Sequence, residues 1–342
     1  MPGIVTNPTA GDIHVNMPLT NFSQKYLQSN EMFVAMRALP NLPVAKQSDL
    51  YYEFSRADFF RDQAEERADG AESVGGGFRL ATDPYFARVY AFHKDVTDRQ
   101  RANQDTPVQL DNSATQFVSM KLMIRRERVF QTRVFNSSIW TGSSTGADID
   151  TNWTGAGAGN LDPIIQVRDE IRSVHQKTGM RPNKMLLGRE AWDTLKDNDD
   201  VLSRITGGAT TAMPAQVMRQ LIAALFEIDE IFVMDAVVNT GAEQNQSVPV
   251  TKSDLNSGES NSFIGGDNVL LYYAPDAVGL EEPTASMQFS WTGFLGSTAN
   301  GMRIRRFRNE PTQSDRIEGE MAFDYKVIAP ELGVFLTSVS TV

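Results

Sequence analysis

A long amphipathic pattern in the first half of the chain predicts one dominant helix. No glycine or proline interrupts Val108 to Phe135, and apolar residues such as Leu110, Ala114 and Phe117 recur among polar residues at helical spacing. We expect a helix over residues 106–138, and about 28 of these residues at 1.5 Å each reach roughly 42 Å. Such a helix is much longer than average, so it can serve as a scaffold for a flat molecule.

Two aromatic-rich segments before this helix predict a long hairpin. Residues 46–55 (KQSDLYYEFS) and Tyr85 to Val96 (YFARVYAFHKDV) have the composition of strands. About 28 mostly polar residues join them, far more than the ~2–5 residues of an ordinary hairpin loop. Long loops of this kind are generally functional, and the alternative interpretation is a mobile surface excursion.

The remaining chain divides into an N-terminal arm, an α/β part and a mostly β end. Prolines break up residues 1–45, where only Ser23 to Leu39 could hold a short amphipathic helix. A helix from Asp162 to Lys177, followed by alternating strands and helices, predicts a compact α/β subdomain over about 180–285. Residues 286–342 have mostly β character.

Composition and charge restrict the class of protein. The 342 residues include no cysteine, which excludes disulfides, zinc–thiolate sites, iron–sulfur clusters and thiol nucleophiles. The most apolar long window, Met218 to Val238, is interrupted by charged residues, so we expect no membrane span. The net charge of −11 argues against tight nonspecific binding of nucleic acid, although it leaves room for a local basic patch.

Motifs for catalysis or cofactor binding are weak. The run Gly155 to Gly159 follows polar residues and departs from GxGxxG, so a flexible loop is a better interpretation than a nucleotide-binding turn. The three histidines lie far apart along the chain: His14, His93 and His175. Adjacent carboxylates such as Glu65/Glu66 and Asp199/Asp200 are typical of solvated turns. We therefore expect no catalytic residue, no cofactor and no metal.

Two basic clusters stand out against the acidic background. The first lies in the long helix and comprises Arg125, Arg126 and Arg128. The second has strand spacing and comprises Arg303, Arg305, Arg306 and Arg308. A nucleic-acid footprint is one interpretation. Pairing with acidic segments of another subunit, such as Asp62–Glu66, is the other, and the acidic net charge favours it.

Four ordered segments resemble the major capsid proteins of tailed bacteriophages, in their siphovirus-type branch. They are FFRDQAEERADG, YFARVYAFHKDVTDRQRANQDTPVQLD, ATQFVSMKLMIRRERVF and RPNKMLLGREAWDTLKDNDDV, and the likeness covers most of residues 40–340. The resemblance implies the α+β, Hong-Kong-97-like fold. It implies these parts: an N-terminal arm (1–45), an E-loop hairpin (46–96), a peripheral domain (97–180) with its spine helix (106–138), an axial domain (181–285) and a C-terminal return to the peripheral sheet (286–342).

The resemblance implies a structural role without catalysis. Copies of the chain are expected to assemble as pentamers and hexamers into an icosahedral shell around phage double-stranded DNA, with nonspecific contacts between the DNA and the interior. Further expected partners are a portal protein, a decoration or cement protein, and a separate scaffolding protein, since the chain begins with the arm and not with a helical prodomain. The expected location is the virion capsid, assembled in the bacterial cytoplasm.

The E-loop of such proteins projects beyond its own subunit, so charges at its tip are expected to contact a neighbour. These residues are Arg61, Asp62, Glu65, Glu66 and Arg67. The namesake of the fold cross-links a loop lysine to an asparagine of another subunit. Lys94 is the only lysine between Lys46 and Lys121 and lies away from the tip, so we expect no cross-link.

Two alternatives remain open at this point. An encapsulin-like nanocompartment would keep the fold and enclose enzymes in place of DNA. A soluble nucleotide-dependent α/β enzyme would depend on the Gly155–Gly159 loop.

Overall fold

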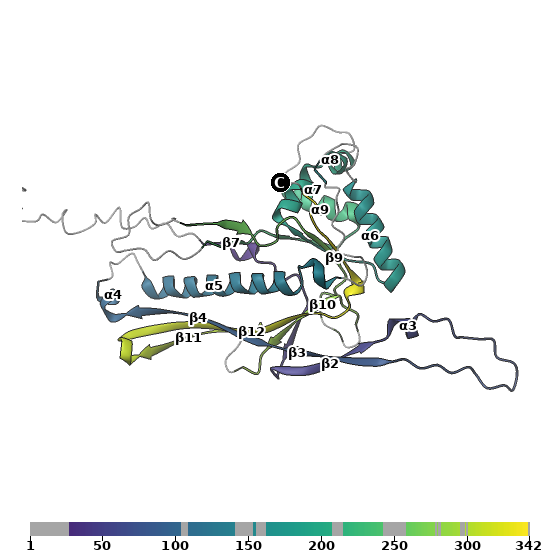
Figure 1. The fold of residues 1–342 in the computed structure, drawn as a ribbon, viewed down its shortest axis with the longest axis horizontal. Coiled ribbons are helices and arrows are strands. Elements are labelled where there is room, and N and C mark those ends of the chain that lie inside the picture. Colours follow the sequence, from purple (N-terminus) through teal and green to yellow (C-terminus); the bar gives the residue numbers. More distant parts are fainter. Residues whose placement is uncertain are drawn as a thin grey trace, which may run out of the picture.

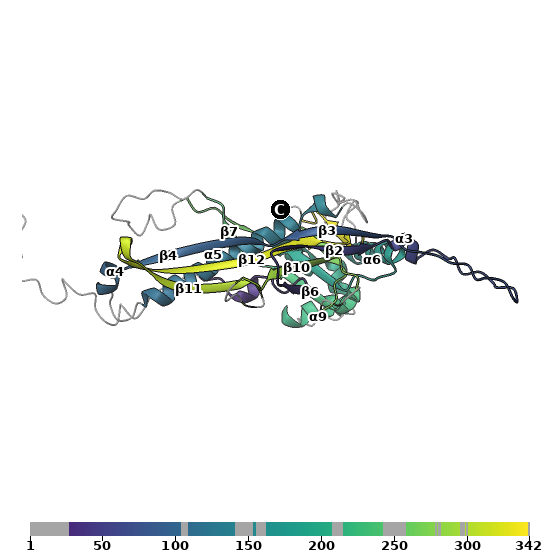
Figure 2. The same cartoon turned by 90° about the horizontal axis from the view of Figure 1, so that it is seen from below.

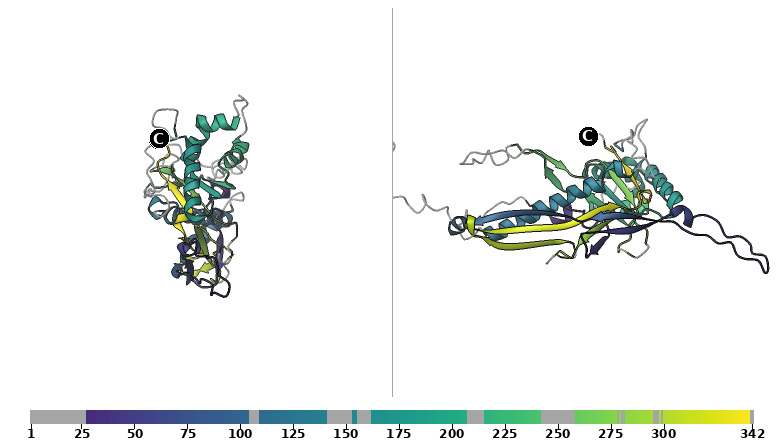
Figure 3. Two further views of the ribbon diagram at one scale, coloured as in Figure 1. Left: turned by 90° about the vertical axis from the view of Figure 1, so that its right-hand side faces the viewer. Right: turned by 60° about the horizontal axis from the view of Figure 1, so that its bottom comes forward.

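The computed structural model describes residues 27–103, 109–140, 153–154, 162–206, 215–241, 258–277, 279, 282–294, 298 and 300–340. Over these residues the molecule is long and flat (Figure 1). A long sheet and a long helix run side by side along it, a second sheet with several helices lies toward one end, and a thin hairpin projects at that end. Seen end-on, the body is narrow (Figure 3).

Among the described residues, the larger sheet has five strands. They are β1 (Asn41–Val44), β4 (Arg88–Thr97), β10 (Ser286–Trp291), β11 (Met302–Asn309) and β12 (Ser314–Val327). β12 is central: β4 pairs antiparallel along one side of it, while β10 and β11 pair antiparallel with successive parts of the other side. β1 adds a parallel pair to β10. Figure 2 shows these long strands extending along the molecule.

The predicted long helix is present as α5 (Leu110–Arg133), whose 24 residues span about 36 Å. Residues 104–108, which include its expected start, lie outside the described residues. Its buried side chains include Val118 and Leu122, which contact β12 at Gly319. A Cβ at Gly319 would lie 2.5 Å from Leu122 Cδ1, so glycine allows the close approach of helix and strand. The short helix α4 (Asp98–Ala102) precedes α5.

The second sheet has the order β13 (Gly333–Leu336), β9 (Val269–Tyr272), β5 (Lys184–Gly188) and β6 (Glu230–Met234). Its strands are almost completely buried, because both faces are covered. One face packs against four helices: α6 (Pro163–Thr178), α7 (Arg189–Asp197), α8 (Asp199–Thr206) and α9 (Ala215–Phe226). The other face joins the core of the larger sheet and α5. A small pair, β7 (Val237–Asn239) and β8 (Asn261–Phe263), lies beside it.

The sequence signals around α6 are confirmed. The Asp162 carboxylate accepts the backbone N–H of Ile164 at 2.8 Å, Pro163 occupies the first turn, and Gly179 closes the helix at φ +71°. The C-terminal part differs from expectation in one strand. β10, β11 and β12 belong to the larger sheet, but β13 pairs with β9 of the second sheet, where its four residues are buried.

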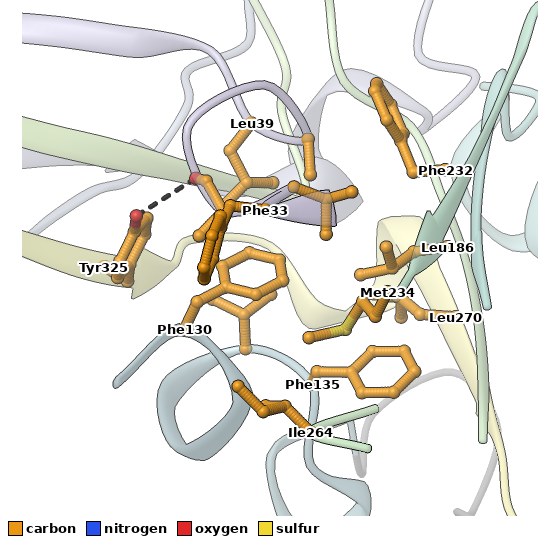
Figure 4. Close-up of a cluster of buried hydrophobic side chains, with 14 of the residues drawn as sticks. Phe33, Leu39, Phe130, Phe135, Leu186, Phe232, Met234, Ile264, Leu270 and Tyr325 are labelled. Carbon is orange, nitrogen blue, oxygen red and sulfur yellow. Dashed lines mark hydrogen bonds between the residues drawn. The ribbon is translucent and has the colours of Figure 1, made fainter. Parts of the chain in front are cut away.

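Residues 33–39 are built into the core between the two sheets, whereas residues 27–32 lie largely at the surface. The sequence predicts an arm with a short helix at Ser23 to Leu39; in the described part only the 3₁₀ turn η1 (Asn30–Met32) is helical. Phe33 and Leu39 pack among side chains of α5 and both sheets (Figure 4). The Tyr325 hydroxyl donates to the carbonyl of Ala35 at 3.0 Å, so β12 holds the backbone of this segment directly.

The hairpin consists of β2 (Ser48–Phe54) and β3 (Leu80–Phe86) in antiparallel register. The expected second strand at 85–96 is therefore divided: β3 lies earlier in the chain, and β4 leaves the hairpin to pair with β12. Ala87 separates the two and is fully buried. The short helix α3 (Arg56–Phe59) follows β2, and the connection to β3 extends away from the body (Figure 1).

Candidate assembly surfaces

One face of the β2–β3 hairpin packs on the body of the molecule. The rings of Tyr51 and Tyr85 stack on Phe289 of β10, with centroids 5.7 and 4.4 Å away. The Tyr51 hydroxyl donates to the Asp83 carboxylate at 2.8 Å, and burial together with this hydrogen bond raises the pKa of Tyr51. These contacts fix the direction in which the hairpin leaves the sheet.

The opposite face of the hairpin is apolar, and its large side chains are exposed in the described part of the chain. Because side chains alternate along a strand, residues of the other parity share this second face. Its large apolar side chains and their exposed fractions are Leu50 59%, Tyr52 67%, Phe54 39%, Leu80 49% and Phe86 52%. A soluble monomer rarely exposes so many neighbouring apolar groups, and such a patch marks an interaction site. We call these five residues the apolar hairpin face.

Aromatic rings extend this face toward α3. Phe54, Phe59 and Phe78 contact one another with centroids 5.5–6.2 Å apart, and Phe59 and Phe78 are about 60% exposed. The Arg79 guanidinium donates to both carboxylate oxygens of Asp58, at 2.9 and 3.1 Å. These hydrogen bonds lower the pKa of Asp58 to about 2. Asp58 lies just after β2 and Arg79 just before β3, so this ion pair joins the two ends of the long connection between the strands.

The charged tip residues predicted to contact a neighbour are all solvent-exposed: Arg61, Asp62, Glu65, Glu66 and Arg67. Arg61 lies 3.9 Å from Asp58, and Arg67 donates to the carbonyl of Ala71. Their contacts with a neighbour stay a prediction. Sequence reasoning missed the apolar hairpin face, although the alternation of Leu50, Tyr52 and Phe54 in the sequence is the signal that could have found it.

The arginines of β11 are engaged within the chain. Arg303 donates to Glu320 at 2.5 Å and Arg305 to Glu318 at 3.0 Å, both across the β11–β12 pair. Arg306 and Arg308 contact carboxylates around the far end of the sheet, with Asp315 shared between them. The hydrogen bonds from Arg306 and Arg101 hold the pKa of Asp315 well below its usual range. Pairing of these four arginines with another subunit stays a prediction and would have to compete with these internal partners.

The three arginines of the cluster in α5 do not all point to the same side of the helix. Arg125 and Arg128 are exposed, whereas Arg126 is 2% exposed and points to the core. The Arg126 guanidinium donates to the Tyr325 hydroxyl at 3.0 Å and lies over the Phe323 ring. We therefore correct the prediction for Arg126: a buried guanidinium cannot reach a neighbouring subunit in this conformation, so its role is to support the core.

A metal site, a membrane span and the sequence motifs considered above each have requirements that can be checked against the described residues. The described part of the chain holds no group of three or more acidic or histidine side chains suited to a metal ion. Within the described ranges no helix is both long and apolar enough to cross a bilayer. The Gly155–Gly159 loop and His14 lie outside the described residues. His93 on β4 is exposed, and His175 is in the last turn of α6.

One curated protein is similar to the chain in sequence over most of its length. This relative is the major capsid protein of Burkholderia phage BcepMu, which is 25% identical over 277 residues, covering 79% of this chain and 80% of that protein. No protein-family model matches the chain.

Solved structures resemble the whole fold at low sequence identity. A phage-related protein from Bordetella bronchiseptica has a TM-score of 0.64 at 17% identity, covering 94% of this chain and 97% of the other. The capsid of cyanophage P-SCSP1u has a TM-score of 0.55 at 10% identity, with coverages of 97% and 94%. The encapsulin of Synechococcus elongatus has a TM-score of 0.51 at 12% identity, with coverages of 95% and 96%.

The resemblance seen in the sequence is thus confirmed in both sequence and fold. The relative in sequence is a major capsid protein, which supports a structural role and not an enzymatic one. The chain has the Hong-Kong-97-like fold and is similar in sequence to a phage major capsid protein.

Proposed function

We propose that the chain is the major structural subunit of a closed icosahedral shell, assembled from pentamers and hexamers around phage double-stranded DNA. The observation that carries the proposal is the apolar hairpin face. It projects from the body on a ribbon fixed at its base, so its apolar side chains are available to a second copy of the chain. Burial of apolar surface between copies would supply the main driving force for association.

The parts of the fold support a division of labour in the shell. We propose residues 46–86, to the end of β3, as the E-loop, in place of the expected 46–96. The following residues to 180, with β4 and α5, are proposed as the peripheral domain, and 181–285 as the axial domain around the five- and six-fold axes. In the same scheme residues 1–45 form the N-terminal arm, and β10, β11 and β12 return to the peripheral domain, whereas β13 joins the sheet of the axial domain. The helix α5 packs along both β4 and β12. Such extensive packing suits a peripheral domain that keeps its shape in the shell.

The remaining expectations belong to the same proposal. A separate scaffolding protein, a portal protein and a decoration or cement protein would act with the shell, which would assemble in the bacterial cytoplasm and reside in the virion. Charges at the hairpin tip would add contacts worth about 0–1 kcal/mol each, and repetition over the shell would make their sum substantial.

An encapsulin-like nanocompartment is the second candidate, because the Synechococcus elongatus encapsulin shares the fold over nearly the whole chain. The contents of the particle separate the two functions. A phage shell encloses nuclease-protected double-stranded DNA, whereas a nanocompartment encloses protein.

The experiment is negative-stain electron microscopy of the full chain, expressed alone and with its neighbouring reading frames, followed by analysis of the particle contents. Closed shells, capsomers or polymerised sheets are expected, and a need for the neighbouring genes would identify a scaffold. Uniform monomers or dimers in both preparations would refute the shell function. Particles filled with protein and free of nucleic acid would favour the nanocompartment.

A further inference from the structure

Exposed cations gather along α5 and the adjacent strand β4. On α5 they are Lys121, Arg125 and Arg128, spaced four and three residues apart so that they share one side of the helix. On β4 they are Arg88 and Lys94, whose even-numbered positions face α5 along with Tyr90 and Phe92. We call Arg88, Lys94, Lys121, Arg125 and Arg128 the cationic face.

Aromatic rings connect the two elements at this face. The Arg125 guanidinium lies 5.1 Å from the ring centroid of Tyr90, and Lys121 Nζ lies 5.5 Å from that of Phe117. Phe117 in turn contacts Phe92, with centroids 5.7 Å apart. A ring face orients a cation without neutralising it, so the N–H donors of these side chains stay available to an anion.

Within the described residues, none of the five cations forms an ion pair. The acidic residues of neighbouring elements are already engaged: Asp95 with Arg316, Asp98 with Arg308, and Asp111 with Arg101 and Arg306. In a chain with 43 acidic and 32 basic residues, five unpaired cations on one face are unexpected. The contrast with β11, whose four arginines all contact carboxylates, sets this face apart.

The shape and sign of the face suit an extended polyanion better than the hairpin tip of a neighbour. The cations of α5 extend over about 10 Å of helix, as a chain of phosphates requires. The one carboxylate between them in sequence, Glu127, is buried and engaged by Val34 and Ala35, so it does not share their exposed side. The tip has both signs, since Arg61 and Arg67 stand among its acidic residues. A surface complementary to this tip would carry both acidic and basic side chains, whereas the cationic face carries only basic ones.

We propose that the cationic face binds the phosphate backbone of double-stranded nucleic acid and is therefore the inner surface of the shell, an inference that rests on the proposed shell function. The contacts are to phosphates, so binding is independent of base sequence. Five phosphate contacts predict that log K falls with log salt concentration with a slope of about −4.5.

The test measures binding of a short DNA duplex of arbitrary sequence to the unassembled full-length chain, by fluorescence anisotropy between roughly 50 and 200 mM salt. One variant combines Lys121→Gln, Arg125→Gln and Arg128→Gln. The matched control combines Arg168→Gln, Arg172→Gln and Arg204→Gln, which removes the same charge from exposed positions of α6 and α8. Thermal melting confirms that both variants fold.

The α5 variant is expected to bind at least tenfold more weakly at the lower salt concentration, with the slope reduced by about three, while the control stays within twofold of wild type. An equal loss in both variants, or no binding by wild type, overturns the proposal. Normal DNA binding with failed assembly of the α5 variant also overturns it and assigns the face to a neighbouring copy. Shell formation by wild type is scored separately by electron microscopy, so failure of the shell function is distinguishable.

Discussion

The carboxylate of Glu127, in the C-terminal half of α5, accepts the backbone N–H of Ala35 at 3.0 Å. Its second oxygen accepts the N–H of Val34 at 3.2 Å. Glu127 is fully buried, and these donors lie more than 90 residues earlier in the chain. The long helix therefore holds the N-terminal segment in place by supplying the acceptors that a second strand would otherwise supply.

The substitution Glu127→Ala would leave both N–H groups buried without an acceptor. Each such group costs about 1–3 kcal/mol, so we expect the free energy of unfolding at pH 5 to fall by at least about 2 kcal/mol. Urea unfolding measures the change. Glu65→Ala at the exposed tip is the matched control, with an expected change within about 0.5 kcal/mol. Equal stability of the two variants would contradict the role of Glu127.

Stability should also depend on pH through Glu127. Burial raises its pKa from 4.5 to about 7, although the hydrogen bonds from Ala35 and Val34 and the charges of Arg126 and Arg37 lower it in part. The folded state thus binds the proton more tightly than the unfolded chain. The stability contributed by this group is fully present below about pH 4.5 and is lost as pH rises through about 7.

The variant Glu127→Gln cannot titrate and isolates this effect. The stability of wild type relative to Glu127→Gln should fall by up to about 3 kcal/mol between pH 4.5 and 8. Urea unfolding of both proteins across this range gives the difference directly. A difference that stays constant with pH would mean that folding does not raise the pKa of Glu127.

The contact of α5 with β12 depends on Gly319. A valine there would place its Cβ within 2.5–2.8 Å of Leu122 and Val118, so the helix must shift. We expect Gly319→Val to destabilise the protein by about 1–3 kcal/mol, measured by thermal or urea unfolding. Gly75→Val in the hairpin connection is the control, because no other atom lies within 4 Å of the position that its Cβ would take. Comparable losses at both positions would refute the packing argument.

The sequence predicted those elements whose signals are local. The helix α5 has an uninterrupted apolar pattern, and α6 has its cap at Asp162 and its stop at Gly179. The end of the hairpin was misplaced because Tyr85 to Val96 is one aromatic run. Only pairing with β12 shows that its second part belongs to the larger sheet.

Long-range contacts decided the rest. Arg125 and Arg126 are adjacent in one basic run, yet one is exposed and the other buried, because the sheet covers a single side of the helix. The buried acid Glu127 follows directly. The sequence around it does not predict that its carboxylate accepts a hydrogen bond from the backbone N–H of Ala35. Likewise the carboxylate partners of Arg303 and Arg305 depend on the register of β11 with β12.

Self-assembly through the apolar hairpin face is the central claim, and the double variant Tyr52→Ser/Leu80→Ser tests it most directly. Both side chains are at least 49% exposed, so the fold should survive. The control is Ile165→Ser/Phe263→Ser, which removes comparable exposed apolar groups from α6 and β8. Sedimentation velocity and electron microscopy should find shells or capsomers for wild type and control, and unassembled subunits for the hairpin variant. Shells in normal yield from the hairpin variant would contradict the account.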